Sequence, residues 1–174
     1  MSLIGRPAPE WCATAYLNGK PVDLGSQDFA ARWHVLYWYP LDFTFVCPTE
    51  IRGFQDLLGE FRAAGAAVAG VSTDSFHSHE RWFADRKTFP DAITHPVVAD
   101  TSHAVSRAFG VLKEDEGVAY RATVIVDDDG VVRSMSVNDL TAGRSPTEVL
   151  RTLQALQSGG LCGVDWRPGD AFAG

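Results

Sequence analysis

The sequence predicts an α/β fold in which helices cover both faces of a central sheet. Two strongly apolar runs, at 34–39 (HVLYWY) and 67–72 (AVAGVS), indicate buried strands. Segments with apolar residues at helical spacing follow each of them, so strands and helices alternate along the chain. With 174 residues and 45% apolar composition, the chain has room for one substantial core.

The first half of the chain gives a hairpin, two strands and one helix. Asn18-Gly19 separates two short alternating runs, which is the usual sequence of a two-residue hairpin turn. The buried strand at 34–39 ends at a proline, and Gly65 ends the helix that follows. The expected ranges are 13–17 and 20–24 for the hairpin, 34–39 and 67–72 for the strands, and 49–64 for the helix.

The second half continues the alternation and ends in a capped helix. Pro90 ends a helix expected at 76–89, and Gly110 ends a short one at 102–109 after a strand at 96–99. The turn 127–130 (DDDG) separates two strands expected at 122–126 and 131–137. The last helix opens with Ser145-Pro146-Thr147-Glu148, a capping box with proline at the first helical position, and ends at Gly159-Gly160.

Composition excludes several classes of function. The net charge of −7 argues against nucleic acid as a main partner, because phosphate binding needs a basic surface. No apolar run approaches the length of a membrane span, so no membrane association is expected. The N-terminal residues carry charge and proline early and lack a signal-peptide pattern. A cytoplasmic location is the resulting expectation.

The three cysteines, Cys12, Cys47 and Cys162, do not indicate a disulfide framework or a structural zinc site. Their number is odd, and no pair has the CxxC spacing. Cys12 lies beside a tryptophan in the expected hairpin and is interpreted as a small buried apolar residue. His77 and His79 stand at the polar start of a helix, where solvated side chains are expected rather than a metal site.

Cys47 has the surroundings of a reactive thiol. A buried strand ends at Pro40, a hydroxyl residue follows at Thr44, and a helical pattern begins directly after Cys47. The thiol is therefore expected near the first turn of a helix, where free N–H groups and the positive dipole end stabilise a thiolate. Because the thiolate is the nucleophile, this context favours chemistry over packing.

Several motifs in this order resemble the peroxiredoxins. Pro40-x-x-x-Thr44-x-x-Cys47, with a distant Arg121, resembles the signature of that family, and Cys162 before Trp166 and Pro168 resembles the tail of its typical two-cysteine members, which include the alkyl hydroperoxide reductase C subunit. The resemblance implies a thioredoxin-like fold: a central mixed β-sheet flanked by helices, with the N-terminal hairpin as an extension. It also implies reduction of hydrogen peroxide and organic hydroperoxides without a metal or organic cofactor, by homodimers that can assemble into rings.

The resemblance assigns roles to single residues. Cys47 attacks the peroxide and becomes a sulfenic acid, while Thr44 and Arg121 bind and polarise the O–O bond. Pro40 shields the sulfenic acid and shapes the loop, and Glu50 matches a position that hydrogen-bonds near the arginine. An arginine at the start of an apolar strand also indicates a site on its own, because burying a guanidinium elsewhere is costly.

Cys162 is expected to resolve the sulfenic acid as a disulfide, which the resemblance places between two subunits. The chain then divides into a peroxidase domain at 1–158 and a tail at 159–174 that carries Cys162. A thioredoxin-like protein or a dedicated disulfide reductase would be the electron donor. Arg144 matches a family position near the resolving tail and is expected to have a structural or interface role.

Two other functions remain open on the same fold. A thiol–disulfide exchanger is one, although it normally needs two close cysteines, and a holdase chaperone is the other. Peroxide consumption coupled to a dithiol separates the three functions.

Overall fold

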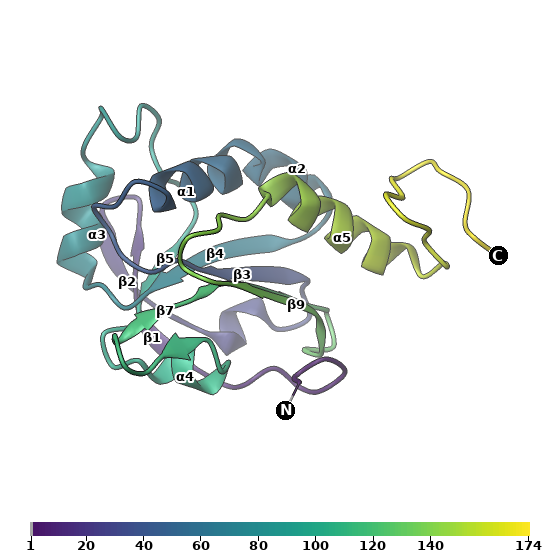
Figure 1. Cartoon of the computed structure of the whole chain (residues 1–174), viewed down its shortest axis with the longest axis horizontal. Helices are drawn as coiled ribbons and strands as arrows, with labels where there is room; N and C mark the ends of the chain where they lie inside the picture. Colours follow the sequence, from purple (N-terminus) through teal and green to yellow (C-terminus); the bar gives the residue numbers. More distant parts are fainter. Residues whose placement is uncertain (1) are drawn as a thin grey trace.

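The computed structural model describes residues 2–174 and contains a seven-stranded mixed sheet with helices on both faces (Figure 1). The strand order in the sheet is β2-β1-β5-β4-β3-β8-β9. The strands of this sheet are β1 (Cys12–Leu17), β2 (Lys20–Gly25), β3 (His34–Trp38), β4 (Ala67–Ser72), β5 (Val97–Ala99), β8 (Arg121–Val126) and β9 (Val132–Asn138). The helices are η1 (Ser26–Phe29), α1 (Cys47–Asp56), α2 (Leu58–Ala63), α3 (Phe76–Phe83), α4 (Ala104–Ala108) and α5 (Pro146–Ser158). The predicted α/β class, with a mixed sheet and an N-terminal hairpin, is therefore confirmed.

The centre of the sheet explains which residues meet at its edge. Strands β3, β4 and β5 are parallel, whereas β8 runs antiparallel to β3, with Tyr37 opposite Thr123. The carboxyl end of β3 therefore lies beside the amino end of β8. Arg121, the first residue of β8, is brought to the point where the chain leaves β3 toward α1.

Two hydrophobic cores cover the two faces. Helices α1, α2, α3 and α5 contribute to one core, which packs on residues such as Val35, Tyr37 and Ile125. Helix α4 and the segment around Trp11 contribute to the other, which packs on Leu36, Trp38 and their neighbours. The side chains of β3 alternate between the two cores, and for this reason the strand is buried throughout and is apolar after His34.

The structure corrects the length of several predicted helices. The helix expected at 49–64 begins at Cys47 and is divided in two at Leu57, with Gly53 and Gly59 on either side of the break. Glycine destabilises helix interiors, which accounts for the break at Leu57. The helix expected at 76–89 ends at Phe83, because the Asp85 side chain accepts bonds from residues 87 and 88 and closes a turn instead.

Other corrections concern small elements. A second sheet, formed by β6 (Leu112–Lys113) and β7 (Val118–Ala119), lies between α4 and β8 and was not predicted. Cys12 was predicted to be buried, but it is exposed. It is the first residue of β1, and the core begins only at Ala15, so its side chain falls outside the buried part of that strand.

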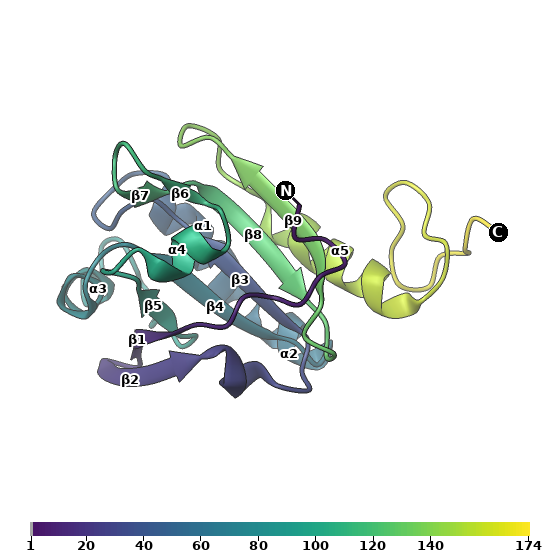
Figure 2. The ribbon, with the colours of Figure 1, turned by 90° about the horizontal axis from the view of Figure 1, so that it is seen from below.

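The residues after α5 form a looped tail that projects from the body of the chain in both views (Figures 1 and 2). The loop is closed by its own contacts: Trp166 stacks on Phe172, and the N–H of Ala173 donates to the carbonyl of Leu161 at 2.7 Å. Arg151 of α5 donates to the carbonyl of Trp166 at 3.1 Å. The tail is thus less loose than its glycine content suggests.

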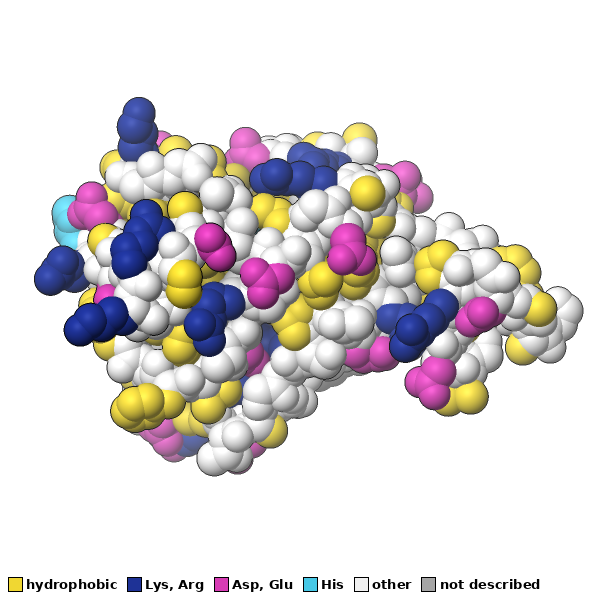
Figure 3. Space-filling model, turned by 90° about the horizontal axis from the view of Figure 1, so that it is seen from above, with side chains coloured by type: hydrophobic (Ala, Val, Ile, Leu, Met, Phe, Trp, Pro, Cys, Tyr) yellow, Lys and Arg dark blue, Asp and Glu magenta, His cyan; other side chains and the backbone are white. Residues whose placement is uncertain are grey.

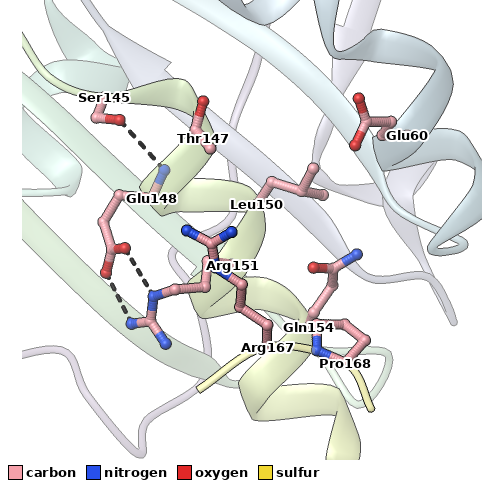
Figure 4. A pocket seen from close by; sticks show the side chains of 9 residues that line it. All are labelled: Glu60, Ser145, Thr147, Glu148, Leu150, Arg151, Gln154, Arg167 and Pro168. Atoms are coloured by element: carbon pink, nitrogen blue, oxygen red, sulfur yellow. Dashed lines mark hydrogen bonds and ion pairs between the residues drawn. The ribbon is translucent and has the colours of Figure 1, made fainter. Parts of the chain in front are cut away.

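A cavity of about 290 Å³ lies between α5, Glu60 and this tail (Figure 4). Its wall includes the start of α5, where the hydroxyl of Ser145 accepts the N–H of Glu148, as the capping box predicts. Glu148 in turn forms a two-pronged ion pair with Arg151. Arg167 and Pro168 line the cavity from the tail side, so the tail meets the body of the chain along α5.

Candidate active site

Cys47 is the first residue of α1, and its side chain is fully buried (0% exposed). Residues 39–46 lead to it from the carboxyl end of β3. Pro48 follows in the first turn, where a missing N–H costs nothing, and Val46 at the N-cap has no polar side chain to occupy the free N–H groups. The helix start therefore favours negative charge at the sulfur, as the sequence predicts.

Arg121 reaches the sulfur from β8. Its Nη1 atom donates to Sγ of Cys47 at 3.4 Å, and its Nε atom donates to the carbonyl of Leu140 at 2.6 Å. The side chain is only 5% exposed, so the guanidinium is held rather than solvated. The structure therefore brings together Cys47 and Arg121, which are 74 residues apart in the sequence.

Glu50 compensates the buried positive charge. Its Oε2 accepts a hydrogen bond from Nη1 of Arg121 at 2.6 Å, and its Oε1 accepts from Nε of Arg144 at 2.9 Å. Glu50 lies one turn after Cys47 on α1 and is 2% exposed. A buried carboxylate between two guanidinium groups fixes the arginine that contacts the sulfur. The expected role of Glu50 near the arginine agrees with this geometry.

Arg144 is more central than the sequence suggests. Besides Glu50, its guanidinium donates to the carbonyls of Ala122 and Trp38, so it ties together α1, β8 and β3. Its guanidinium carbon also lies 5.6 Å from the centroid of the Tyr37 ring. In this chain Arg144 is a structural part of the site itself, and within residues 2–174 no hydrogen bond or ion pair joins its side chain to the tail.

The loop before Cys47 contains Pro40 and Thr44. Pro40 is buried, next to Tyr39, whose N–H donates to the carbonyl of Val71 at 3.0 Å. The hydroxyl of Thr44 donates to the carbonyl of Leu41 at 2.9 Å, rather than to the sulfur. Because its hydrogen is used in this way, the Thr44 oxygen is left to act as an acceptor.

The same loop holds a strained residue. Phe43 has φ of 56°, in the left-handed region that bulky side chains avoid, and its side chain is 61% exposed. Strain of this kind costs of order 1–3 kcal/mol and persists where the surroundings determine the conformation. One support is Trp82 of α3, whose ring lies 5.7 Å from that of Phe43.

A buried polar network also supports this loop, and sequence reasoning missed it. One carboxylate oxygen of Asp42 accepts from the Tyr39 hydroxyl at 2.8 Å, and the other lies 2.8 Å from Nδ1 of His79. The N–H of Asp42 donates to Asp74 at 2.8 Å. His79 was expected to be solvated, but it is 0% exposed. The signal that could have found it is helical spacing, since His79 is one turn before the buried Phe83 of α3.

Cys162 lies outside this cluster. It is in the tail after α5, where its thiol donates to the carbonyl of Ala155 at 3.6 Å and lies 3.2 Å from the hydroxyl of Ser158. Its side chain is half-buried, and the sulfur is free in this structure. The tail leaves the body of the chain beyond the end of α5, away from the start of α1 (Figures 1 and 2).

Within residues 2–174, no group of three or more His, Cys, Asp and Glu side chains is placed to hold a metal ion. In the same residues, no helix has the length and hydropathy needed to cross a bilayer. On the face seen in Figure 3, acidic and basic side chains are interspersed.

Comparison with known proteins gives a consistent result. The model of the AhpC/TSA family matches residues 4–135. The chain is 44% identical to peroxiredoxin prdx-2 of Caenorhabditis elegans, over 97% of this chain and 87% of that protein. It is 40% identical to a thioredoxin peroxidase of Echinococcus granulosus, over 97% of this chain and 90% of that protein.

Solved structures agree with the sequence matches. The reduced 2-Cys peroxiredoxin of Plasmodium vivax superposes with a TM-score of 0.92 and 33% identity, covering 98% of this chain and 92% of that one. AhpC of Mycobacterium bovis superposes with a TM-score of 0.85 and 37% identity, covering 94% of this chain and 97% of that one. The arrangement of sheet and helices described above is therefore that of these proteins.

Proposed function

Because the chain belongs to the AhpC/TSA family, and is a peroxiredoxin and so a thiol-dependent peroxidase, we propose that Cys47 is the residue that its peroxide substrate oxidises. The observation that carries this proposal is the hydrogen bond from Arg121 to the Cys47 sulfur at the first turn of α1. In it, a cationic donor and the positive end of a helix meet at one thiol.

The reaction follows from the donors around the sulfur. The Cys47 thiolate attacks one oxygen of the hydroperoxide, so that an S–O bond forms while the O–O bond breaks. The second oxygen leaves with the electron pair of that bond and takes up a proton to become water or an alcohol, and Cys47 becomes a sulfenic acid. Arg121 stabilises the negative charge on the sulfur and on the departing oxygen, because its charge is fixed and its N–H groups are directional.

Thr44 and Pro40 complete the proposed substrate site. The Thr44 hydroxyl already donates to Leu41, and in this proposal its oxygen accepts the O–H of the hydroperoxide. Pro40 is buried beside the same loop and has no N–H that could compete for the substrate. Glu50 holds Arg121 in place and acts through it.

We further propose that Cys162 of a second subunit resolves the sulfenic acid. Attack of the Cys162 thiol on the Cys47 sulfur forms a disulfide and releases water. Cys47 is fully buried, so the start of α1 must open for the two sulfurs to meet. The tail of one chain projects away from its own active site, which favours a homodimer in which residues 159–174 reach the partner (Figure 1).

The oxidised enzyme must be reduced by a dithiol. A thioredoxin-like protein or a dedicated disulfide reductase fits, because thiol–disulfide exchange with either returns two electrons and restores both thiols. One relative is called a thioredoxin peroxidase, which supports the first of these.

Two variants test this function. Cys47→Ser is expected to abolish peroxide consumption coupled to a dithiol while leaving the fold intact. After one equivalent of peroxide, non-reducing electrophoresis should show a covalent dimer for the native chain and a monomer for Cys162→Ser. Peroxide turnover that survives in Cys47→Ser would show that another residue is the nucleophile. Disulfide reduction without peroxide would indicate an exchanger, and activity independent of Cys47 would indicate a holdase.

A further inference from the structure

A buried tyrosine and histidine lie behind the site and take no part in the chemistry proposed above. Tyr37 of β3 and His95, before β5, are 0% and 1% exposed, and the hydroxyl of Tyr37 lies 2.7 Å from Nε2 of His95. Nδ1 of His95 lies 3.0 Å from Oε1 of Gln55, which is on α1. The same Oε1 accepts the N–H of Thr94 at 2.8 Å, and Nε2 of Gln55 donates to the Thr94 hydroxyl at 2.9 Å. These four residues form a continuous chain of hydrogen bonds, which we call the strut.

The direction of each hydrogen bond in the strut is determined by its partners. Because Oε1 of Gln55 accepts a backbone N–H, it is an acceptor, and Nδ1 of His95 must donate to it. Nε2 of His95 then carries the lone pair, and the Tyr37 hydroxyl donates to it. Burial lowers the pKa of His95 to about 3, with a smaller effect of Arg62, and burial raises the pKa of Tyr37 well above its usual value. Both side chains are therefore neutral at working pH.

The strut fastens the far part of α1 to the sheet. Gln55 lies in the third turn of the helix that begins at Cys47. The preceding residue, Phe54, stacks on the Tyr37 ring with centroids 4.1 Å apart and planes at 12°. The backbone of β4 leaves no room for a side chain opposite this ring, because a Cβ atom at Gly70 would stand 2.8 Å from the Tyr37 hydroxyl oxygen. Tyr37 therefore anchors the third turn and also lies under the guanidinium of Arg144.

The first turn of α1 is held by a different set of contacts. Its N-cap residue, Val46, has no polar side chain, and the anchors of that part of the helix are the ion pairs of Glu50 and the burial of Cys47 itself. Oxidation and release of Cys47 remove one of these. Opening that starts at Cys47 and breaks the ion pairs of Glu50 then reaches the third turn, which the strut fixes by separate contacts.

We propose that the strut determines where the unwinding of α1 stops when Cys47 leaves its buried position. The proposal rests on the disulfide exchange proposed above, in which Cys47 must leave that position. None of the strut residues makes a hydrogen bond to the Cys47 sulfur, so their role in the proposal is to position α1. By holding the third turn, they keep the helix closed for longer around the peroxide-reactive thiol and slow the appearance of the disulfide.

Hydrogen exchange of the reduced protein tests the strut without any oxidation. Gln55→Leu leaves the N–H of Thr94 and Nδ1–H of His95 without an acceptor, whereas Gln55→Glu keeps an acceptor for both. We expect the amides of residues 53–57 to exchange roughly tenfold faster in Gln55→Leu and at nearly the native rate in Gln55→Glu. Tyr37→Phe cuts the other end of the strut while keeping the stacked ring, and should act in the same direction.

Rapid kinetics then tests the link to function. In the strut variants Gln55→Leu and Tyr37→Phe, we expect the bimolecular rate of Cys47 oxidation to change less than about twofold and the rate of disulfide formation to rise roughly fivefold. More peroxide should also be needed to overoxidise Cys47 to the sulfinic acid, because the sulfenic acid is consumed sooner. The matched control is Val105→Ala. This substitution creates a cavity beside α4, in the core on the opposite face of the sheet.

The outcomes separate this inference from a purely structural role and from the proposed function. If the strut variants and Val105→Ala lower thermal stability alike and leave both the exchange of residues 53–57 and the disulfide rate at native values, the inference is wrong. If exchange rises but no variant, including the native chain, forms a disulfide, the strut holds α1 and the proposed role of Cys162 fails instead. Disulfide formation that slows in the strut variants would also overturn the inference.

Discussion

Replacing Arg121 by glutamine is expected to slow the oxidation of Cys47 by peroxide about 10²–10³-fold. Glutamine removes the positive charge that lies 3.4 Å from the sulfur, and its shorter side chain cannot donate from the position of Nη1. At an effective dielectric constant of about 20, two unit charges at this distance attract each other by about 5 kcal/mol. Glu50, which is 2.6 Å from the same Nη1 atom, cancels part of this attraction.

The attraction that remains after this cancellation is available to stabilise the transition state. Removing one preorganised donor from a developing oxyanion costs about 3–4 kcal/mol of transition-state stabilisation, which corresponds to the predicted loss in rate. Arg121→Lys keeps the charge but cannot donate to Cys47, Glu50 and Leu140 from one planar group, so it should recover only part of the rate.

The assay is a single-turnover stopped-flow measurement of Cys47 oxidation by hydrogen peroxide and by an alkyl hydroperoxide. Alkylation of Cys47 by iodoacetamide, measured on the same variants, reports the thiolate alone. A rate of peroxide reduction that falls much further than the rate of alkylation would show that Arg121 acts on the O–O bond as well as on the thiolate. A loss of less than tenfold in Arg121→Gln would refute the proposed role of this arginine.

Three further predictions follow from other parts of the site. Glu50→Ala leaves two buried guanidinium groups without a counter-charge and should lower the free energy of unfolding by about 3–5 kcal/mol in urea titrations; a change below about 1 kcal/mol would contradict the ion-pair geometry. His95 has a pKa of about 3 in the folded chain and a usual value of 6.5, so only the unfolded chain binds its proton between these values, and stability is lost as the pH falls through this window. His95→Gln should therefore reduce the loss of unfolding free energy between pH 6.5 and 4.5 by about 2 kcal/mol, and an unchanged slope would show that this histidine is not buried in neutral form. Gly70→Ala places a Cβ atom 2.8 Å from the Tyr37 ring and should cost about 1–3 kcal/mol in thermal unfolding while speeding disulfide formation; native stability would mean that the ring can move.

Local sequence patterns were sufficient for the fold class and for the position of Cys47. Strand β3 is apolar after His34, and α5 opens with a capping box, so both were predictable from a few neighbouring residues. The break at Leu57 and the early end of α3 were not, because glycine placement and the side chain of Asp85 decide them against a helical pattern that continues in the sequence.

The contacts that position the site were beyond local patterns, because they join distant segments. Arg144 and Glu50 are 94 residues apart, and His95 and Tyr37 are 58 residues apart. Neither pair has a local signature, because an arginine at a helix entry and a histidine before a strand are ordinary surface residues in most chains. Arg144 becomes buried because β8 and β9 lie beside β3 in the sheet and the chain after β9 returns to Glu50 of α1. His95 becomes buried because it precedes β5, on the other side of β3, where it meets Tyr37 and Gln55.

This difference between what was predictable and what was not has a chemical cause. The nucleophile depends on the first turn of one helix, so consecutive residues determine its environment. Its reactivity depends on a charge that must stay buried without water, and a buried charge needs a counter-charge and hydrogen bonds from several elements. Here Glu50 supplies the counter-charge from α1, and the carbonyl of Leu140 accepts the Nε–H of Arg121. The nucleophile is therefore predictable from the sequence around it, whereas the residues that support it can be identified only once the order of the strands in the sheet is known.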